Sequence, residues 1–385
     1  MRVLLVLAVV SLLSWLWLTF ARGMFWRTDV RLPAGVDGAG TDPGRWPSVA
    51  VVVPARDEAD VLPLSLPALS GQDYPGRSRV ILVDDNSGDG TADLVAAAWP
   101  EVTIVAPGEP PPGWTGKLWA LRAGVAAAGQ VDLLLLTDAD IVHRPGSLTA
   151  LVRATQAHRL DLVSQMARLR VETGWERLVV PAFVYFFALL YPFRWVNRPG
   201  SRTAAAAGGC SLVRRAALER AGGLDAIGAA VIDDVALARL LKRSGSRIFL
   251  GLADLIASVR PYDGLGPLWR MVSRSAYAQL RHSPVVLAGT VLGLLLVFVA
   301  PPAATVAGAI TGDLPALLLG AAGWLLMAAT FVPTLRYYGR PAAAAPLLPL
   351  TAGLYLAMTV DSAVQHYRGR GAAWKGRTYP APRAR

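Results

Sequence analysis

Long uncharged apolar runs lie toward both ends of this chain and enclose a charged middle. Residues 3–20 carry no charge and approach the ~20 residues that a helix needs to cross a bilayer. Three more apolar runs follow Pro284, at residues 285–310, 314–332 and 342–360. Because the charged middle is long enough for one globular domain, we expect a soluble domain tethered to a membrane from both sides.

The composition fits this division, since 54% of the 385 residues are hydrophobic and the mean hydropathy is +0.41. We therefore expect an N-terminal transmembrane anchor at residues 1–22 and a linker rich in Gly, Pro and Asp at residues 23–46. A globular domain at 47–283, transmembrane or re-entrant helices at 284–366 and a basic tail at 367–385 complete the predicted order.

Basic residues orient the first apolar run. Only Arg2 precedes it, whereas three arginines follow it closely: Arg22, Arg27 and Arg31. This bias predicts a multi-pass protein of the cytoplasmic membrane whose globular domain faces the cytoplasm. A cleaved signal peptide is the alternative, since Thr19 and Ala21 are small, but the run is longer than the roughly 7 to 15 residues of a signal core.

Two further features narrow the class of protein. The formal net charge is +11, but the basic residues are scattered or flank apolar runs, which favours anionic lipid headgroups over nucleic acid as partners. The single cysteine, Cys210, excludes an intramolecular disulfide, as expected in a reducing compartment.

Two apolar segments are ambiguous. Residues 178–196 are rich in aromatic side chains and flanked by arginines, which favours a helix in the membrane interface over a spanning helix; a buried core helix is the alternative. If all three C-terminal runs spanned the bilayer, the basic tail would lie outside the cell. We therefore expect residues 342–360 to be re-entrant or interfacial.

The middle of the chain alternates between strand and helix patterns. β-rich runs at 48–53, 79–83, 102–105 and 131–136 are separated by helical stretches that end near residues 69, 98 and 128. Alternation of this kind predicts an α/β fold with a mostly parallel sheet flanked by helices. Ligands collect beyond the carboxyl ends of strands in such sheets, so the loops there are where chemistry is expected.

Acidic residues follow three of these strands. The first leads into VVVPARDE (51–58) and the second into VILVDDNSGDGT (80–91), in which Asp84 and Asp85 can accept hydrogen bonds from a ribose or base, or merely close a turn. Asp138 and Asp140 follow the fourth strand and lie on one side of an extended backbone. Two such carboxylates suit Mg²⁺ or Mn²⁺ shared with substrate phosphates.

A second acidic pair lies farther along the chain. Asp233 and Asp234 open an amphipathic helix, where acids complement the helix dipole, or where one of them serves as a general base. Lys117 begins another predicted helix and is either a solvated surface lysine or part of a binding pocket.

Taken in order, these segments resemble the inverting family-2 glycosyltransferases of GT-A fold over roughly residues 48–281. The carrying motifs are VVVPARDE, VDDNSGDGT, TDAD, GGCSLVRR (208–215) and DDVALARLLKRSG (233–245). The resemblance implies a nucleotide-sugar donor, with a UDP-sugar expected, and a hexosyl transfer with inversion in which Asp234 deprotonates the acceptor. Asp233 stands where the family has Glu.

The resemblance also implies roles for individual residues. It assigns donor contacts to Pro54, Arg56, Glu58, Asp84, Asp85, Lys117 and Asp138, and Mg²⁺ or Mn²⁺ binding to Asp138 and Asp140. It places Gly208, Gly209, Cys210 and Arg274 on the acceptor side. Only Arg274 remains of the Gln-x-x-Arg-Trp motif of processive synthases, which argues against polymer synthesis.

The acceptor is expected to be a lipid. The terminal apolar helices, GWTGK (113–117) and AAWKGRTYP (372–380) resemble the hopanoid-biosynthesis-associated branch and its relatives acting on carotenoid-type lipids. A polyprenyl-phosphate glycosyltransferase and a non-catalytic membrane scaffold that kept a nucleotide-binding domain are the alternatives. A dehydrogenase is disfavoured because no Gly-x-Gly-x-x-Gly follows the first strand.

Overall fold

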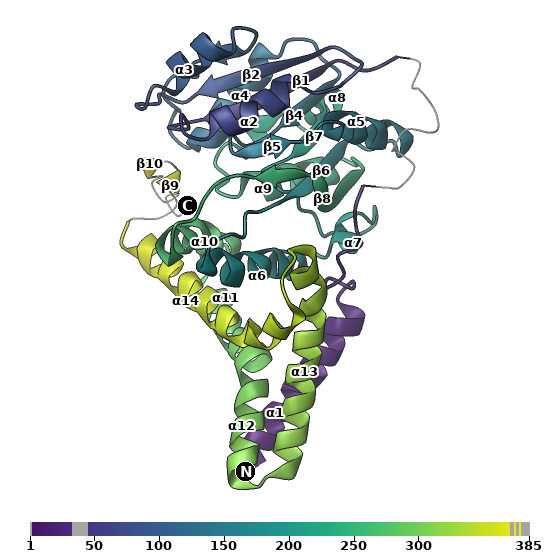
Figure 1. The fold of residues 1–385 in the computed structure, drawn as a ribbon, viewed down its shortest axis with the longest axis vertical. Coiled ribbons are helices and arrows are strands. Elements are labelled where there is room, and N and C mark those ends of the chain that lie inside the picture. Colours follow the sequence, from purple (N-terminus) through teal and green to yellow (C-terminus); the bar gives the residue numbers. More distant parts are fainter. Residues whose placement is uncertain (1, 33–44, 370–372, 375–376, 379–385) are drawn as a thin grey trace. The chain divides into compact units, whose positions relative to one another are not determined.

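The computed structural model describes residues 2–32, 45–369, 373–374 and 377–378, so parts of the predicted linker and of the basic tail lie outside the described residues. The chain forms two compact units (Figure 1). The helical unit comprises Met1–Thr28, Val171–Arg194 and Tyr262–Ala372, and the sheet unit comprises Asp29–Arg170, Trp195–Pro261 and Ala373–Arg385.

The first half of the sheet unit follows the predicted alternation of strands and helices. Strands β1, β2, β3 and β4 pair in parallel, in the order β3-β2-β1-β4. The elements are β1 (Val49–Ala55), α2 (Leu62–Ser70), β2 (Ser78–Asp84), α3 (Thr91–Ala98), β3 (Thr103–Val105), α4 (Gly116–Ala127) and β4 (Leu133–Leu136).

Four strands that the sequence did not predict extend this sheet to the order β3-β2-β1-β4-β7-β6-β8-β5. Strand β7 is antiparallel to both of its neighbours, and β5 is antiparallel to β8, so the described sheet is mixed, with four parallel pairings. The added elements are β5 (Ile141–His143), α5 (Ser147–Ala157), β6 (Leu162–Arg168), β7 (Ser211–Arg214), α8 (Arg215–Arg220), η1 (Leu224–Ile227), α9 (Asp233–Arg243) and β8 (Ile248–Ser258). A short separate hairpin pairs β9 (Ala373–Trp374) with β10 (Arg377–Thr378).

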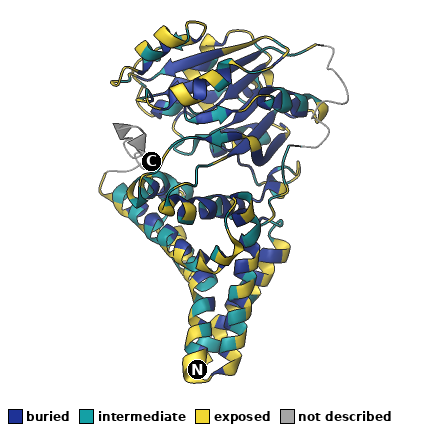
Figure 2. Cartoon of the chain, in the orientation of Figure 1, coloured by how far each residue is buried: buried dark blue, intermediate teal, exposed yellow. Residues whose placement is uncertain are grey.

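The central strands are buried on both faces, as Figure 2 shows in dark blue. Every residue of β1 and β4 is buried, because helices cover both sides of a mostly parallel sheet. Gly124 lets α4 lie against β1 and β2, since a Cβ there would overlap Val52 and Val83. This close contact packs α4 directly on β1 and β2.

Helices α1 (Arg2–Ala21), α12 (Ala300–Thr311) and α13 (Leu314–Tyr337) pack on one another in the helical unit. Helix α14 (Leu348–Tyr367) runs oblique to α13 (Figure 1) and packs on α6 (Gly174–Leu190) and α10 (Leu265–Gln279). The remaining elements are α7 (Phe193–Val196), α11 (Pro284–Leu294), the π-helical turn η2 (Leu295–Val299) and η3 (Ala342–Leu347). By length and composition, five described helical segments are apolar enough to cross a membrane: 2–21, 174–196, 284–311, 314–337 and 342–367.

The π-helical turn η2 has an identifiable cause. Pro301 lacks the N–H that would otherwise bond to the carbonyl of Val297, four residues earlier. The indole Nε1 of Trp15 on α1 donates to that carbonyl at 2.6 Å, and the Trp15 ring packs edge-on against Phe298. A carbonyl left unpaired in hydrocarbon would cost several kcal/mol, so this contact makes the π-helical turn compatible with an apolar environment.

Candidate active site

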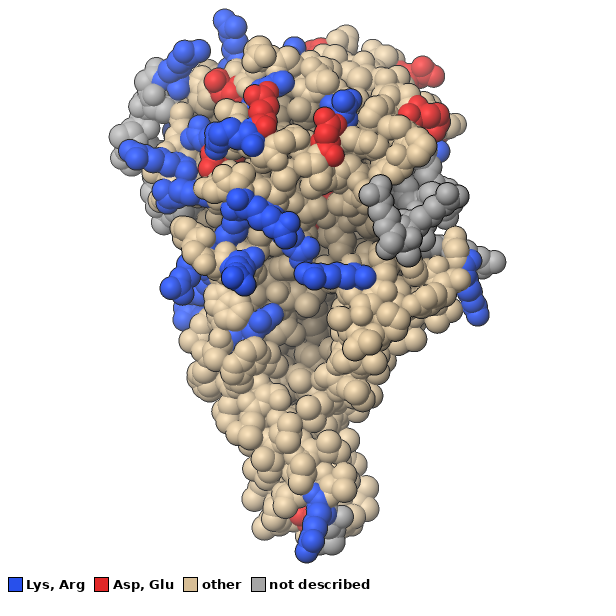
Figure 3. Space-filling view, turned by 180° about the vertical axis from the view of Figure 1, so that it is seen from behind, with Lys and Arg blue, Asp and Glu red and all other residues tan. Residues whose placement is uncertain are grey.

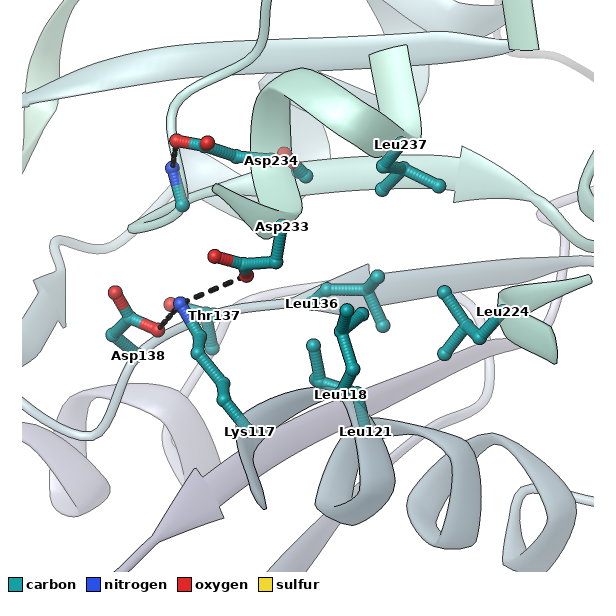
Figure 4. Close-up of a pocket in the computed structure, with 12 residues that line it drawn as sticks. Lys117, Leu118, Leu121, Leu136, Thr137, Asp138, Leu224, Asp233, Asp234 and Leu237 are labelled. Carbon is teal, nitrogen blue, oxygen red and sulfur yellow. Dashed lines mark hydrogen bonds and ion pairs between the residues drawn. The ribbon is translucent and has the colours of Figure 1, made fainter. Parts of the chain in front are cut away.

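The candidate site lies at the carboxyl end of β4, in a pocket of the sheet unit (Figure 4). Helix α4 contributes Lys117, the segment after β4 contributes Asp138, and the start of α9 contributes Asp233 and Asp234. Leucines form an apolar wall beside these charged groups. The lining residues are Lys117, Leu118, Leu121, Leu136, Thr137, Asp138, Gly208, Ser211, Leu224, Asp233, Asp234 and Leu237.

Lys117 connects the two acidic pairs predicted from the sequence. Its Nζ lies 2.8 Å from Asp138 Oδ1 and 3.1 Å from Asp233 Oδ2, as the dashed lines in Figure 4 mark. Burial by itself would lower the pKa of Lys117, but Asp138, Asp233 and Asp234 outweigh burial and hold it above its ordinary value. Lys117 is therefore a charged member of the pocket and not a solvated surface lysine.

Asp234 is held by the backbone. Its Oδ2 accepts a hydrogen bond from Gly208 N at 2.8 Å and its Oδ1 accepts one from Val235 N at 2.7 Å. Burial and the neighbouring Asp233 raise the pKa of Asp234 to about 7, although Lys117 and the two N–H groups oppose the increase. A carboxylate whose pKa lies near neutrality is well matched to accept a proton.

Asp140 faces a different cation from the one that holds Asp138. Its Oδ2 accepts hydrogen bonds from Ser258 Oγ at 2.9 Å and from Arg260 Nε at 3.0 Å. The other end of the same guanidinium pairs with Glu58 Oε1 at 2.7 Å. The pairing of β5 with β8 brings these groups together, because Ile141 lies opposite Ser258.

The predicted donor loops after β1 and β2 are joined to each other. Arg56 Nη1 donates to the carbonyl of Asp85 at 2.7 Å and lies 3.5 Å from its buried carboxylate. Asp84 Oδ1 accepts a hydrogen bond from Ser87 Oγ at 2.5 Å. Pro54 is tolerated inside a central strand because the pairing of β1 with β4 ends at Val52.

Residues 208–210 have different surroundings, since Gly208 lines the pocket and Cys210 lies in the hydrophobic core. A Cβ at Gly208 would lie 3.2 Å from Lys117 Nζ and 3.6 Å from carboxylate oxygens of both Asp138 and Asp234, so Gly208 keeps the centre of the pocket open. Cys210, in contrast, is fully buried in the hydrophobic core, where burial raises the pKa of its thiol to about 12. The thiol of Cys210 is therefore packed in the core, and the acceptor-side role predicted for this residue stays a prediction.

Residues 47–277 match the family described as "Glycosyltransferase like family 2", which covers more than half of the chain. The chain belongs to the family-2 glycosyltransferases. The predicted family and enzyme class are thereby confirmed.

Individual relatives match over shorter stretches. The chain is 32% identical over 108 residues to the 4,4'-diaponeurosporenoate glycosyltransferase of Staphylococcus haemolyticus, over 28% of each chain. It is 33% identical over 159 residues to an N-acetylglucosaminyltransferase of Mesorhizobium japonicum, over 38% of this chain and 36% of the relative. The chain thus matches well under two thirds of the length of these relatives.

A solved structure shares the fold over nearly the whole chain. The mannosyltransferase PcManGT of Pyrobaculum calidifontis, solved with GDP-Man and Mn²⁺, aligns with a TM-score of 0.57 at 22% identity. The alignment covers 94% of this chain and 99% of that one. At this identity the likeness shows the fold, and the predicted GT-A architecture with apolar helices near both ends is confirmed.

The acidic motif of this glycosyltransferase, Asp138 and Asp140, fits a divalent cation shared with a substrate. Among the described residues no group of three His, Cys, Asp or Glu side chains could hold a metal alone. Mg²⁺, however, is usually bound by one or two carboxylates together with substrate phosphates. Asp138 Oδ2 and Asp140 Oδ1 accept no hydrogen bond from any described residue, so each acid keeps an oxygen for this purpose.

The sequence did not indicate Arg260 or the apolar wall of the pocket. Arg260 follows β8, a strand that was not predicted, so its place at a strand end went unnoticed. Arg274, predicted on the acceptor side, lies on α10 of the helical unit, while the other predicted site residues belong to the sheet unit. Its role stays a prediction.

The state of Asp234 predicts how the reaction depends on pH. Below about pH 7 the carboxyl of the free enzyme is protonated and cannot accept a proton, so with Asp234 as the base we expect kcat/KM to fall about tenfold per pH unit on the acidic side. Above that pH the rate should be level. Initial rates at low substrate concentration between about pH 5 and about pH 9 measure this; a rate that stays level down to about pH 5, as an ordinary carboxyl with a pKa of ~4 would give, contradicts the assignment.

Proposed function

We propose that this glycosyltransferase moves a hexose from a nucleotide sugar, with a UDP-sugar as the expected donor, to a lipid acceptor. The observation that carries the proposal is the convergence of Asp138, Lys117, Asp233 and Asp234 on one pocket at the carboxyl edge of the sheet. Arg56, Asp84 and Asp85 are the candidates for donor contacts, because they end or directly follow strands β1 and β2, whose carboxyl ends meet at that edge.

The proposed reaction is a single displacement with inversion. Asp234 takes the proton of the acceptor hydroxyl, whose oxygen attacks the anomeric carbon while the bond from that carbon to the diphosphate breaks. The hydrogen bonds from Gly208 and Val235 hold the carboxylate for this step. A divalent cation held by Asp138, Asp140 and the substrate phosphates would neutralise the charge that develops on the leaving nucleotide.

An apolar acceptor is supported by two observations. The pocket carries an apolar wall that includes Leu118, Leu121 and Leu237 beside its charged groups. The helical unit has candidate spanning segments, and on the face in Figure 3 a broad band of it shows no charged side chain. A hopanoid or carotenoid-type lipid fits these features, and a polyprenyl phosphate is the second candidate. The product distinguishes the two, because the sugar would be attached to a hydroxyl oxygen of the first and to a phosphate oxygen of the second.

We propose three spans, α1, α11–α12 and α13, with the sheet unit in the cytoplasm. Arginines stand at one end of each span, Arg22 and Arg27 after α1, Arg281 before α11, and Arg336 and Arg340 at the end of α13 and after it. The positive-inside tendency places all of these ends in the cytoplasm, with Arg2 as the exception.

Helix α14 is proposed to lie in the membrane interface. Its Asp361 accepts a hydrogen bond from Trp269 Nε1 at 2.8 Å, and Ser362 Oγ accepts one from Tyr277 N at 3.0 Å, so one face is polar and bound to α10. Leu350, Val360 and Val364 on α14 are exposed and apolar. An interfacial α14 leaves the basic tail in the cytoplasm and removes the conflict of three C-terminal spans.

Labelling of engineered cysteines tests this topology. Because the native Cys210 is buried, labelling should come from the single cysteine engineered at Gly312 or at Gly369. We expect a membrane-impermeant maleimide to label position 312 but to label position 369 only after lysis. Labelling of both positions without lysis would refute an interfacial α14.

The activity itself is tested with purified protein in lipid nanodiscs. We expect one UDP-sugar from a panel of UDP- and GDP-sugars to release nucleoside diphosphate, only with Mg²⁺ or Mn²⁺ and only when lipid extract is added. Mass spectrometry of the extract then identifies the glycosylated lipid. Failure to bind or turn over any nucleotide sugar would favour the scaffold alternative.

A further inference from the structure

Each carboxylate of the acidic motif is already held by a cation of the chain. Lys117 Nζ lies 2.8 Å from Asp138 Oδ1, and Arg260 Nε lies 3.0 Å from Asp140 Oδ2. The two cations come from different parts of the sheet unit, since Lys117 is on α4 and Arg260 follows β8.

Both cations also hold a second acid. Lys117 bridges to Asp233 at 3.1 Å and Arg260 bridges to Glu58 at 2.7 Å. The side chains of Lys117 and Arg260 are 17% and 28% exposed, so water screens these pairs only in part. A divalent cation that approaches Asp138 and Asp140 is therefore repelled by two positive charges that already contact these carboxylates.

We infer that Lys117 and Arg260 are built-in counter-cations that keep the affinity of the acidic motif for a divalent cation low until a nucleoside diphosphate is present. The inference rests on the proposed function. It deepens that function by giving Lys117 and Arg260 a positioning role, in which they control when the metal is held.

The physical reason is competition for the same negative charge. An opposite charge within about 4–6 Å shifts the proton affinity of a carboxylate by one to three pKa units, and the same neutralisation weakens its attraction for a metal ion. A diphosphate brings its own oxygens and negative charge, so it can both ligate the metal and face the two cations. The oxygens left open on Asp138 and Asp140 are then sufficient to complete the site.

The test measures binding of Mn²⁺ alone, by the loss of the free-ion signal in electron paramagnetic resonance, to the full chain in nanodiscs. We expect weak binding to the wild type. Lys117→Met and Arg260→Gln should each bind Mn²⁺ about tenfold or more tightly, because each removes a competing charge. Addition of UDP or GDP should tighten binding to the wild type and reduce the difference between it and the variants.

Two variants control for other effects. Lys117→Arg keeps the charge and should keep weak Mn²⁺ binding. Arg122→Gln removes a cation from the same helix, where Arg122 pairs with Asp225, and should leave the affinity for Mn²⁺ unchanged. A thermal melt of each variant confirms folding before binding is compared.

The outcomes separate the inference from the function on which it rests. Folded Lys117→Met and Arg260→Gln proteins that bind Mn²⁺ no better than the wild type, while the wild type turns over a nucleotide sugar, overturn the inference alone. Tighter Mn²⁺ binding in both variants with no response to any nucleotide would show that the two cations compete with the metal, but it would overturn both the release by a nucleoside diphosphate and the proposed donor.

Discussion

Replacing Asp234 with asparagine is expected to lower sugar transfer about a thousandfold, within the range that a positioned general base contributes. The substitution keeps the size of the side chain but removes its ability to take a proton. Both carboxylate oxygens now accept backbone N–H groups, from Gly208 and Val235, so one of these bonds is lost when an amide nitrogen replaces an oxygen. A modest loss of stability should accompany the loss of rate.

The measurement is single-turnover transfer from the identified donor, together with the dissociation constant of the donor. We expect the dissociation constant to change little. Asp225→Asn makes the same chemical change at an exposed aspartate near the pocket and should leave the rate unaffected. If Asp234→Asn stays within tenfold of the wild type, Asp234 is not the base; a larger loss in Asp233→Asn would assign that role to Asp233.

Asp140→Ala is expected to lower transfer at least about a hundredfold. Charge stabilisation by a bound metal is worth several kcal/mol in the transition state, and each ~1.4 kcal/mol is a factor of ten in rate. The substitution also leaves Arg260 paired with Glu58 but without Asp140, which adds uncompensated positive charge to the site. The concentration of Mn²⁺ needed for half-maximal activity should rise.

A titration of activity with Mn²⁺ measures this effect. Asp93→Ala removes an exposed acid from α3 of the same unit and serves as the matched control. Unchanged activity and an unchanged Mn²⁺ response in Asp140→Ala would show that this carboxylate does not hold the metal. That result would also refute the proposed role of Asp138 and Asp140 as a shared metal site.

Local sequence patterns were sufficient to predict the strands in the first half of the sheet unit. The four predicted strands are present, with ends displaced by up to two residues: the run predicted at 131–136 is β4 at Leu133–Leu136. The helix predicted from residue 117 is α4, which begins at Gly116. Strands buried on both faces have continuous apolar runs, and the helices between them have apolar residues at the helical period. Both patterns can therefore be recognised in a single sequence.

The second half of the sheet left no comparable pattern. Strand β5 has three residues, and Ser164 and Gln165 interrupt the apolar run of β6. These strands are stabilised by their partners, through pairings such as Ile141 with Ser258, and pairing between segments more than a hundred residues apart has no local signature.

The sequence by itself determined the class of this protein: an α/β glycosyltransferase domain with acids after its strands and apolar helices near both ends. It did so because the apolar runs of buried strands, the helical period and the order of the acidic motifs are local properties of the chain. Only the tertiary structure decided that Lys117 bridges Asp138 to Asp233, that Arg260 holds Asp140, and that Cys210 belongs to the core. Charges act on one another through distance in space, and those distances exist only once β7, β6, β8 and β5 have joined the sheet.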